Sequence, residues 1–111
     1  MEKSDALAAL AALAQDSRLD IFRLLVGVGP DGLPAGQIGA ALGLPAATLS
    51  FHLSQLKQAG LLTCRRDSRH LIYAAAIPTM TALLGYLTAH CCGGDPAACG
   101  LPGAAPHAGR P

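Results

Sequence analysis

One stretch decides the fold, and from Pro45 to Tyr73 it reads PAATLSFHLSQLKQAGLLTCRRDSRHLIY. Its first half predicts an amphipathic helix. Pro45 suits the first turn, where a missing N–H costs nothing. The apolar residues that follow at spacings of three and four, which predict one buried stripe, are Ala46, Leu49, Leu53 and Leu56. Gly60 then supplies the left-handed cap at which many helices end.

The opposite side of this helix carries short polar groups, which can donate and accept hydrogen bonds at base edges. The residues expected to select a base sequence are Thr48, Ser50, His52 and Gln55, with Ser50 and His52 at the flanks. Lys57 is expected to touch the nucleic-acid backbone instead. Phe51 is an exposed aromatic with two open interpretations: it contacts a thymine methyl, or it packs under the segment that follows.

That segment is a basic hairpin. Residues 61–64 and 71–73 have the composition of strands, and between them lie Arg65, Arg66 and Arg69. Lys and Arg outnumber acids within residues 45–73, although the whole chain has a formal net charge of only +1. A phosphate-contacting patch requires positive charge focused in this way. Helix and hairpin together predict a winged helix-turn-helix, with the helix in the major groove and the hairpin against the backbone.

The rest of the chain predicts a mainly α domain with a small β-hairpin: about five helices plus a two-stranded wing. Its 111 residues suffice for one core, and that core is aliphatic because Trp is absent and aromatics are 4%. No apolar run approaches the length of a membrane span, so no membrane partner is expected. The absence of a secretory-type leader favours a cytoplasmic, reducing compartment.

Two helices are expected before the helix-turn-helix. The apolar face predicted for the first is Leu7, Leu10, Ala11 and Ala14. Its small residues allow close packing, either in the core or in a dimer interface. The second is expected to begin at a cap formed by Asp16 or Ser17. Its predicted core face is Leu19, Phe22, Leu25 and Val26.

A third helix is expected from Pro34 to Leu42, with Ile38 inward and Gly43 as its stop. The turn at Gly43 and Leu44 then joins it to the helix that starts at Pro45, which makes the helix-turn-helix unit. The last helix is expected to begin at Ile77. Its predicted apolar stripe is Met80, Leu83, Leu84, Leu87 and Cys91.

Residues 90–99, with the sequence HCCGGDPAAC, contain the second informative pattern. Cys91 and Cys92 precede a Gly-Gly pair and a Pro, and Cys99 lies on the far side. Soft thiolates select soft ions, and three sulfurs satisfy a pyramidal trivalent arsenic or antimony centre without a fourth ligand. We therefore expect arsenite, or alternatively antimonite, as the ligand and no organic cofactor. The domain would span residues 1–92, with 93–111 a Gly/Pro-rich tail that contributes Cys99.

Zinc competes for this site, because His90 or His107 would complete a four-ligand set. Consecutive helical side chains point about 100° apart, so placing His90, Cys91 and Cys92 on one ion requires unwinding of the helix end. A third interpretation is that Cys91 is a buried helix residue and the other cysteines are unrelated. Cys64 stands apart on the first predicted strand and is expected to be structural, with a redox role left open.

Several of these motifs resemble the arsenical-resistance repressor (ArsR) family. Leu49-Ser50-Phe51-His52-Leu53, with the Ala59-Gly60-Leu61-Leu62 run and the arginines, resembles its recognition helix and wing. Residues 16–21 resemble its second helix. The cysteine site that many arsenic-sensing members carry before the recognition helix is missing from residues 35–42. The Cys-Cys…Cys arrangement at residues 91–99 resembles a subgroup that binds arsenite there.

The resemblance implies a homodimeric winged-helix repressor that binds double-stranded operator DNA and leaves it when a metal or metalloid binds. It also implies that Arg65, Arg66 and Arg69 contact phosphate or the minor groove. A zinc- or redox-sensing repressor on the same scaffold is the alternative. A thiol enzyme is disfavoured, because the chain has no Cys-x-x-Cys motif and no acid–base pair near the thiols in sequence.

Overall fold

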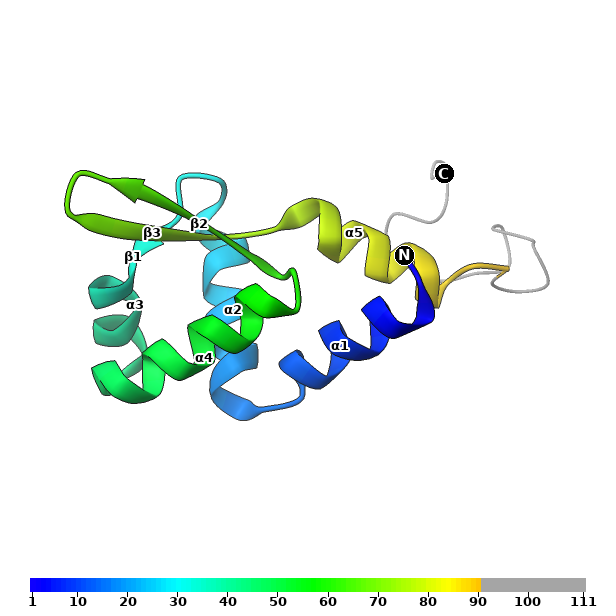
Figure 1. Ribbon diagram of the computed structural model, residues 1–111, viewed down its shortest axis with the longest axis horizontal. Helices are drawn as coiled ribbons and strands as arrows, with labels where there is room; N and C mark the ends of the chain where they lie inside the picture. The colour runs from blue at the N-terminus through cyan, green and yellow to red at the C-terminus, as the bar shows by residue number, and fades with distance from the viewer. Residues whose placement is uncertain (91–111) are drawn as a thin grey trace, which may run out of the picture.

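The computed structural model describes residues 1–90, which form five helices and a three-stranded antiparallel sheet (Figure 1). In chain order the elements are α1 (Lys3–Leu13), α2 (Asp16–Val28), β1 (Leu33–Pro34), α3 (Ala35–Leu42), α4 (Ala46–Gln58), β2 (Leu62–Asp67), β3 (His70–Ala75) and α5 (Ile77–Leu87). This arrangement confirms the predicted winged helix-turn-helix. None of these helices is both long and apolar enough to cross a membrane.

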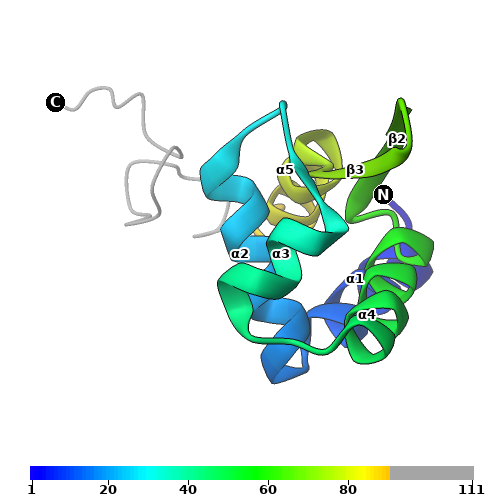
Figure 2. The same cartoon turned by 90° about the vertical axis from the view of Figure 1, so that its left-hand side faces the viewer.

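The helix-turn-helix unit is formed by α3 and α4. α3 ends at Gly43, whose φ of 67° lies in the left-handed region that glycine adopts without strain. The backbone N–H of Leu44 donates to the carbonyl of Gly39 at 3.0 Å, which satisfies an orphan carbonyl at the helix end. Figure 2 shows α3 and α4 side by side, with the hairpin above α4.

The hairpin pairs β2 with β3 from Leu62 opposite Ala75 to Asp67 opposite His70. Its turn is therefore only Ser68 and Arg69, and Ser68 has a φ of 60°. The strands are longer than predicted. β1 pairs with the other side of β3 and makes a third strand that the sequence analysis missed, because a two-residue strand carries no alternation pattern.

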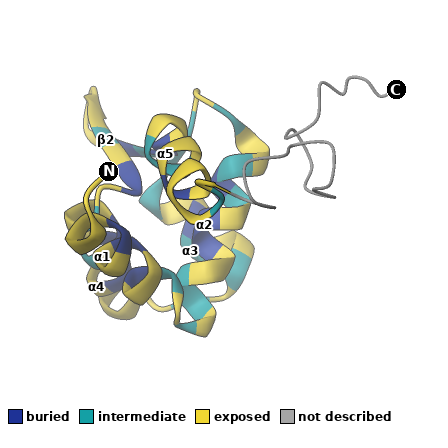
Figure 3. Cartoon of the chain, turned by 90° about the vertical axis from the view of Figure 1, so that its right-hand side faces the viewer, coloured by how far each residue is buried: buried dark blue, intermediate teal, exposed yellow. Residues whose placement is uncertain are grey.

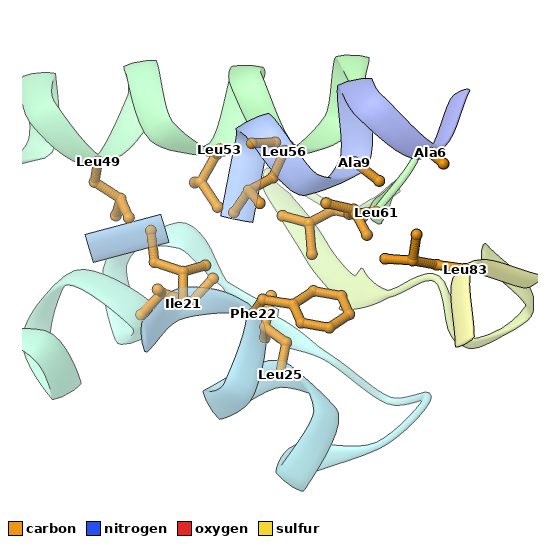
Figure 4. Close-up of a cluster of buried hydrophobic side chains, with 13 residues drawn as sticks. Ala6, Ala9, Ile21, Phe22, Leu25, Leu49, Leu53, Leu56, Leu61 and Leu83 are labelled. Atoms are coloured by element: carbon orange, nitrogen blue, oxygen red, sulfur yellow. The ribbon is translucent and has the colours of Figure 1, made fainter. Parts of the chain in front are cut away.

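The core lies between α1, α2, α4 and the middle of α5, which contributes Leu83 (Figure 4). The buried stripe predicted for α4 is confirmed for Leu49, Leu53 and Leu56, whose exposed fractions are at most 4%. Ala46 is exposed, so its place in that stripe was wrong. It lies in the first turn of α4, at the groove that this helix shares with α3 and β3.

The predicted apolar face of α1 was wrong. Its buried residues are Ala6, Ala9 and Ala12, whereas Leu7 and Leu10 are 58% and 40% exposed. Ala11 and Ala14 are exposed as well. The alanine side faces inward because side chains this short let the α1 backbone approach α2 and α4 closely, and the leucines are left on the surface.

The other helices also differ from prediction in part. On α2, Ile21 is fully buried and Leu19 is 43% exposed, the reverse of what was expected. Its N-cap is Gln15, whose Oε1 accepts from the backbone N–H of Arg18 at 2.9 Å, and neither Asp16 nor Ser17 serves as the cap. The correct part of the prediction is Phe22 and Leu25, both buried.

On α5, Leu83 is buried as predicted, but Leu84 and Leu87 are 55% and 54% exposed. Seen from the end of the molecule where α1 and α5 lie, both helices are largely exposed (Figure 3). The last helix therefore uses one side of its stripe for the core and leaves the other side to solvent. Cys91 lies outside the described residues, so its predicted place on this stripe stays a prediction.

Candidate nucleic-acid interface

The exposed side of α4 carries Thr48 and Ser50, two of the four residues predicted to read bases, and Lys57, which was predicted to contact the DNA backbone. Thr48, Ser50 and Lys57 are exposed, and Gln55 is half-buried. The buried leucines of the same helix fix its rotation, so these side chains point away from the core. α4 therefore presents hydroxyl, amide and ammonium groups on one surface, as a helix in the major groove requires.

His52 does not belong to that surface. It is 8% exposed, and its Nδ1 lies 3.4 Å from Nη1 of Arg18. Arg18 is held in turn by α1, because its Nε donates to the carbonyl of Ala12 at 2.6 Å. The structure thus places His52 on the buried side of α4, away from the side chains expected to select bases. Its spacing explains this position, since it lies three residues after Leu49 and four before Leu56.

Phe51 is 57% exposed and lies on the side of α4 opposite its buried leucines. Its ring packs edge-on with that of His52, with centroids 5.7 Å apart and planes at 61°. Packing under the hairpin, one of the two interpretations of Phe51, is therefore not what the structure shows. The aromatic ring is part of the exposed surface of α4.

The three arginines of the hairpin are all exposed. Arg65 and Arg66 lie within β2 and point to opposite faces, since side chains alternate along a strand. Arg69 lies in the turn. Nη2 of Arg65 donates to the carbonyl of Asp31 at 2.8 Å, which ties the hairpin to the loop before β1. Within residues 1–90, no hydrogen bond holds the side chain of Arg66 or Arg69, so both guanidinium groups are available to phosphate.

A groove of about 600 Å³ separates the hairpin from the recognition helix. Its walls are the small residues of α3, the first turns of α4, and Leu71 and Tyr73 of β3. Figure 2 views the molecule from the side on which α3, α4 and the hairpin lie. Among residues 1–90, no charged side chain lines the groove, so the positive charge of the hairpin is concentrated on its strand and turn.

Cys64 is half-buried and stands opposite Tyr73 in the sheet register. Burial raises the pKa of Tyr73 above its ordinary value, and the neighbouring Cys64 thiol raises it further. Both side chains point to the same face of the sheet, because directly opposed residues in an antiparallel pair share a face. This packing fits the structural role that the sequence predicted for Cys64.

The predicted thiolate ligands Cys91, Cys92 and Cys99 lie outside the described residues. Residues 1–90 contain no group of three or more His, Cys, Asp or Glu side chains placed to hold a metal. His90, the candidate fourth ligand for zinc, is exposed and has a φ of 60°. The ligand set thus rests on its donor chemistry: three soft thiolates suit a soft ion.

Sequence reasoning missed two residues that support this surface. Arg18 fixes the inner side of α4 through His52, and the carbonyl of Asp31 holds Arg65. Both contacts join residues 34 positions apart in the chain. No local pattern connects residues at that separation, so only the folded structure reveals them.

The fold and this surface define a winged-helix DNA-binding protein. A helix-turn-helix domain model matches residues 13–65. The transcriptional regulator YgaV of Escherichia coli is 30% identical over 82 residues, which cover 74% of this chain and 81% of YgaV. The transcriptional activator HlyU of Vibrio cholerae is 30% identical over 89 residues, 78% of this chain and 80% of HlyU.

Solved structures agree. HlyU from Vibrio cholerae superposes with a TM-score of 0.62 over 78% of this chain and 97% of that chain, at 30% identity. The homodimeric winged helix-turn-helix DNA-binding domain of Mb0332 from Mycobacterium bovis, described as a possible ArsR-family regulator, gives 0.63 over 78% and 81%, at 27% identity. The chain belongs to the helix-turn-helix transcriptional regulators with the ArsR-like winged-helix fold, and it is not an enzyme.

Proposed function

We propose that the protein is an arsenite-responsive transcriptional repressor that acts in the cytoplasm as a homodimer. The dimer binds double-stranded operator DNA and leaves it when trivalent arsenic, or antimony, binds Cys91, Cys92 and Cys99. The observation that carries this proposal is the position of α5. It ends at Leu87, a few residues before Cys91, and within residues 1–90 it leaves exposed apolar surface beside α1.

That surface supports the dimer. Leu7 and Leu10 of α1 and Leu84 and Leu87 of α5 are each 40% to 58% exposed, and Figure 1 places the two helices at the same end of the molecule. Exposed apolar patches mark interaction sites, and the similar Mycobacterium bovis domain is homodimeric. In a two-fold dimer through α1 and α5, two α4 helices would enter successive major grooves about 34 Å apart.

The division of labour at the DNA follows from exposure and charge. Exposed side chains of α4, with Thr48 and Ser50 among them, read base edges and choose the sequence. The arginines of the hairpin, together with Lys57, contact phosphate or the minor groove and supply affinity that is independent of sequence. His52 holds α4 in place from the buried side.

Arsenite acts through the end of α5. A trivalent arsenic atom needs three sulfurs, so it draws Cys99 back onto Cys91 and Cys92 next to the interface helix. A small shift there changes the distance between the two α4 helices, because α5 links the cysteine segment to the dimer surface. Allosteric coupling of about 1–3 kcal/mol between the two sites is typical and sufficient for release from an operator.

The test is fluorescence anisotropy of a labelled operator duplex under reducing conditions, titrated with arsenite. The wild type should dissociate. Cys91→Ser, Cys92→Ser and Cys99→Ser should bind the duplex as the wild type does and stay bound. Cys64→Ser is the matched control and should still dissociate, because Cys64 lies in the sheet. Release that persists in all three serine variants would disprove the sensor site.

A redox or zinc response is the second candidate. One solved form of Vibrio cholerae HlyU, 29% identical to this chain, is described as reduced, which draws attention to thiol oxidation in a similar protein. His90 is exposed beside Cys91 and has a ring nitrogen suited to zinc. Parallel titrations with peroxide and with zinc separate these alternatives. Release by peroxide alone would indicate a redox sensor, and loss of a zinc response in His90→Ala would indicate a zinc sensor.

A further inference from the structure

The middle of the exposed side of α4 is apolar. Phe51 is 57% exposed and Ala47 is exposed one turn earlier. Residues four apart lie on one line of a helix, so the two form a short apolar strip opposite the buried leucines. Hydroxyl and amide side chains flank this strip: Thr48, Ser54, Gln55 and Gln58. A large exposed aromatic in the centre of a polar surface can contact an apolar group of whatever binds that surface.

Neither the core, the groove under the hairpin nor the proposed dimer surface provides an apolar partner for Phe51. Phe51 is absent from the core cluster and from the lining of the groove under the hairpin. The exposed leucines of the proposed dimer surface lie on α1 and α5, at the end of the molecule remote from the first turns of α4 (Figure 1). The ring of Phe51 therefore faces the same ligand as the rest of the exposed side of α4.

The chemistry of the major groove identifies the partner. Bases remain stacked there, so a side chain meets only their edges, and the apolar group on those edges is the C5-methyl of thymine. Phe is among the side chains suited to contact that methyl. The strip from Ala47 to Phe51 rises about 6 Å along the helix, close to two base steps of about 3.4 Å along one strand.

We propose that Phe51, with Ala47 beside it, reads thymine methyl groups in each half of the operator and so determines part of its sequence. This inference rests on the proposed function, since it assumes operator binding by α4. It narrows the sequence to half-sites with one thymine, or two adjacent thymines, opposite the strip. The flanking polar residues then read the neighbouring positions by hydrogen bonds.

The experiment removes the methyl and nothing else. Duplexes bound by the full-length protein are first selected from a random pool, and each thymine of the best sequence is then replaced in turn by deoxyuridine. Burial of one methyl contributes enough free energy for about a fourfold change in affinity. We expect one or two positions per half-site to lose about fourfold by anisotropy, and the others to lose nothing.

Two variants assign that loss to its residue. Phe51→Ala should bind the thymine duplex more weakly and be insensitive to deoxyuridine at the same positions. Ser54→Ala, on the same exposed side, should keep the full sensitivity. Phe51→Ala should unfold at the wild-type temperature, because the ring is mostly outside the core.

The outcomes are distinct. Failure to select any duplex, with no salt-dependent binding, would contradict the proposed function itself. Binding that no deoxyuridine substitution weakens would overturn the methyl contact and leave the proposed function intact. Equal sensitivity in Phe51→Ala and the wild type would overturn the assignment to Phe51.

Discussion

At the scale of single residues, Gly32 is a position that only glycine can fill. Its φ is +67°, and a Cβ there would collide with the carbonyl oxygen of Tyr73 and lie 3.1 Å from Cγ2 of Ile72. An alanine in this left-handed backbone conformation would be strained, and its Cβ would push β1 away from β3. Together these effects should lower the free energy of unfolding of Gly32→Ala by about 2–4 kcal/mol. Urea denaturation followed by circular dichroism measures this change.

The matched control is Gly27→Ala. Gly27 lies within α2, and a Cβ there meets nothing within 4 Å. Alanine should therefore stabilise the helix by up to about 1 kcal/mol. If both substitutions destabilised equally, the loss in Gly32→Ala would be a general response to alanine and not a consequence of the close approach to Tyr73.

A second residue-scale prediction concerns alkaline pH. Burial, and then the Cys64 thiol, raise the pKa of Tyr73 above its ordinary 10.0, so the folded state holds this proton after the unfolded state has lost it. The stabilising contribution is intact below about pH 10 and disappears as the pH rises through the folded-state value. Tyr73→Phe has no proton to lose and should show a shallower fall in stability between about pH 9 and 11.

The unfolding temperatures of Tyr73→Phe and the wild type are compared across that pH range. Tyr86→Phe serves as the control, because Tyr86 is an exposed residue of α5, and it should follow the wild-type profile. Superimposable alkaline profiles for Tyr73→Phe and the wild type would show that the Tyr73 hydroxyl does not contribute.

Residue by residue, the sequence predicted the three buried leucines of α4 and several of its exposed polar groups. Thr48, Ser50 and Lys57 are exposed where polarity indicated. His52 was misplaced, because its ring was judged by chemistry and not by its helical position between Leu49 and Leu56. Its partner Arg18 is distant in sequence, so no local pattern indicated that a buried imidazole ring would have a polar partner.

At the scale of elements, the hairpin should act as a source of affinity without sequence preference. Arg69 lies in its exposed turn, so Arg69→Ala should weaken binding to all duplexes and reduce the slope of log affinity against log salt by about one per protomer. Arg23→Ala removes an exposed arginine of α2 and should leave the slope unchanged. A changed sequence preference in Arg69→Ala, at constant slope, would contradict this role.

Element by element, long periodic segments were predictable and short or ambiguous ones were not. α4 and the hairpin carry a clear stripe and a clear basic turn, and both formed. β1 has two residues and exists only because β3 offers it an edge. α1 is apolar on several sides, so periodicity could not choose between Leu7 and Ala6, and close packing against α2 and α4 decided in favour of alanine.

At the scale of the whole molecule, burial of the α1 alanines in place of its leucines determines where apolar surface is exposed. Burial of the alanines turns Leu7 and Leu10 outward, and α5 turns Leu84 and Leu87 outward at the same end. The sequence analysis considered the small residues of α1 for a dimer interface, whereas the structure leaves its large residues on the surface. One end of the molecule thus carries the apolar surface proposed for a second copy, and the other carries the helix and hairpin proposed to bind DNA.

Leu84→Glu tests whether the apolar end of the molecule forms the dimer. A carboxylate on α5 would be buried without a partner in a dimer through α1 and α5, so the variant should sediment as a monomer at micromolar concentration. Operator affinity should fall by about 100-fold or more, since two linked half-sites gain that much from effective concentration. Leu71→Ser removes an exposed leucine of the hairpin, 43% exposed, and should keep the dimer mass. A dimeric Leu84→Glu with wild-type operator affinity would place the interface on another face. Arsenite bound near the end of α5 would then have no direct contact through which to change the distance between the two α4 helices.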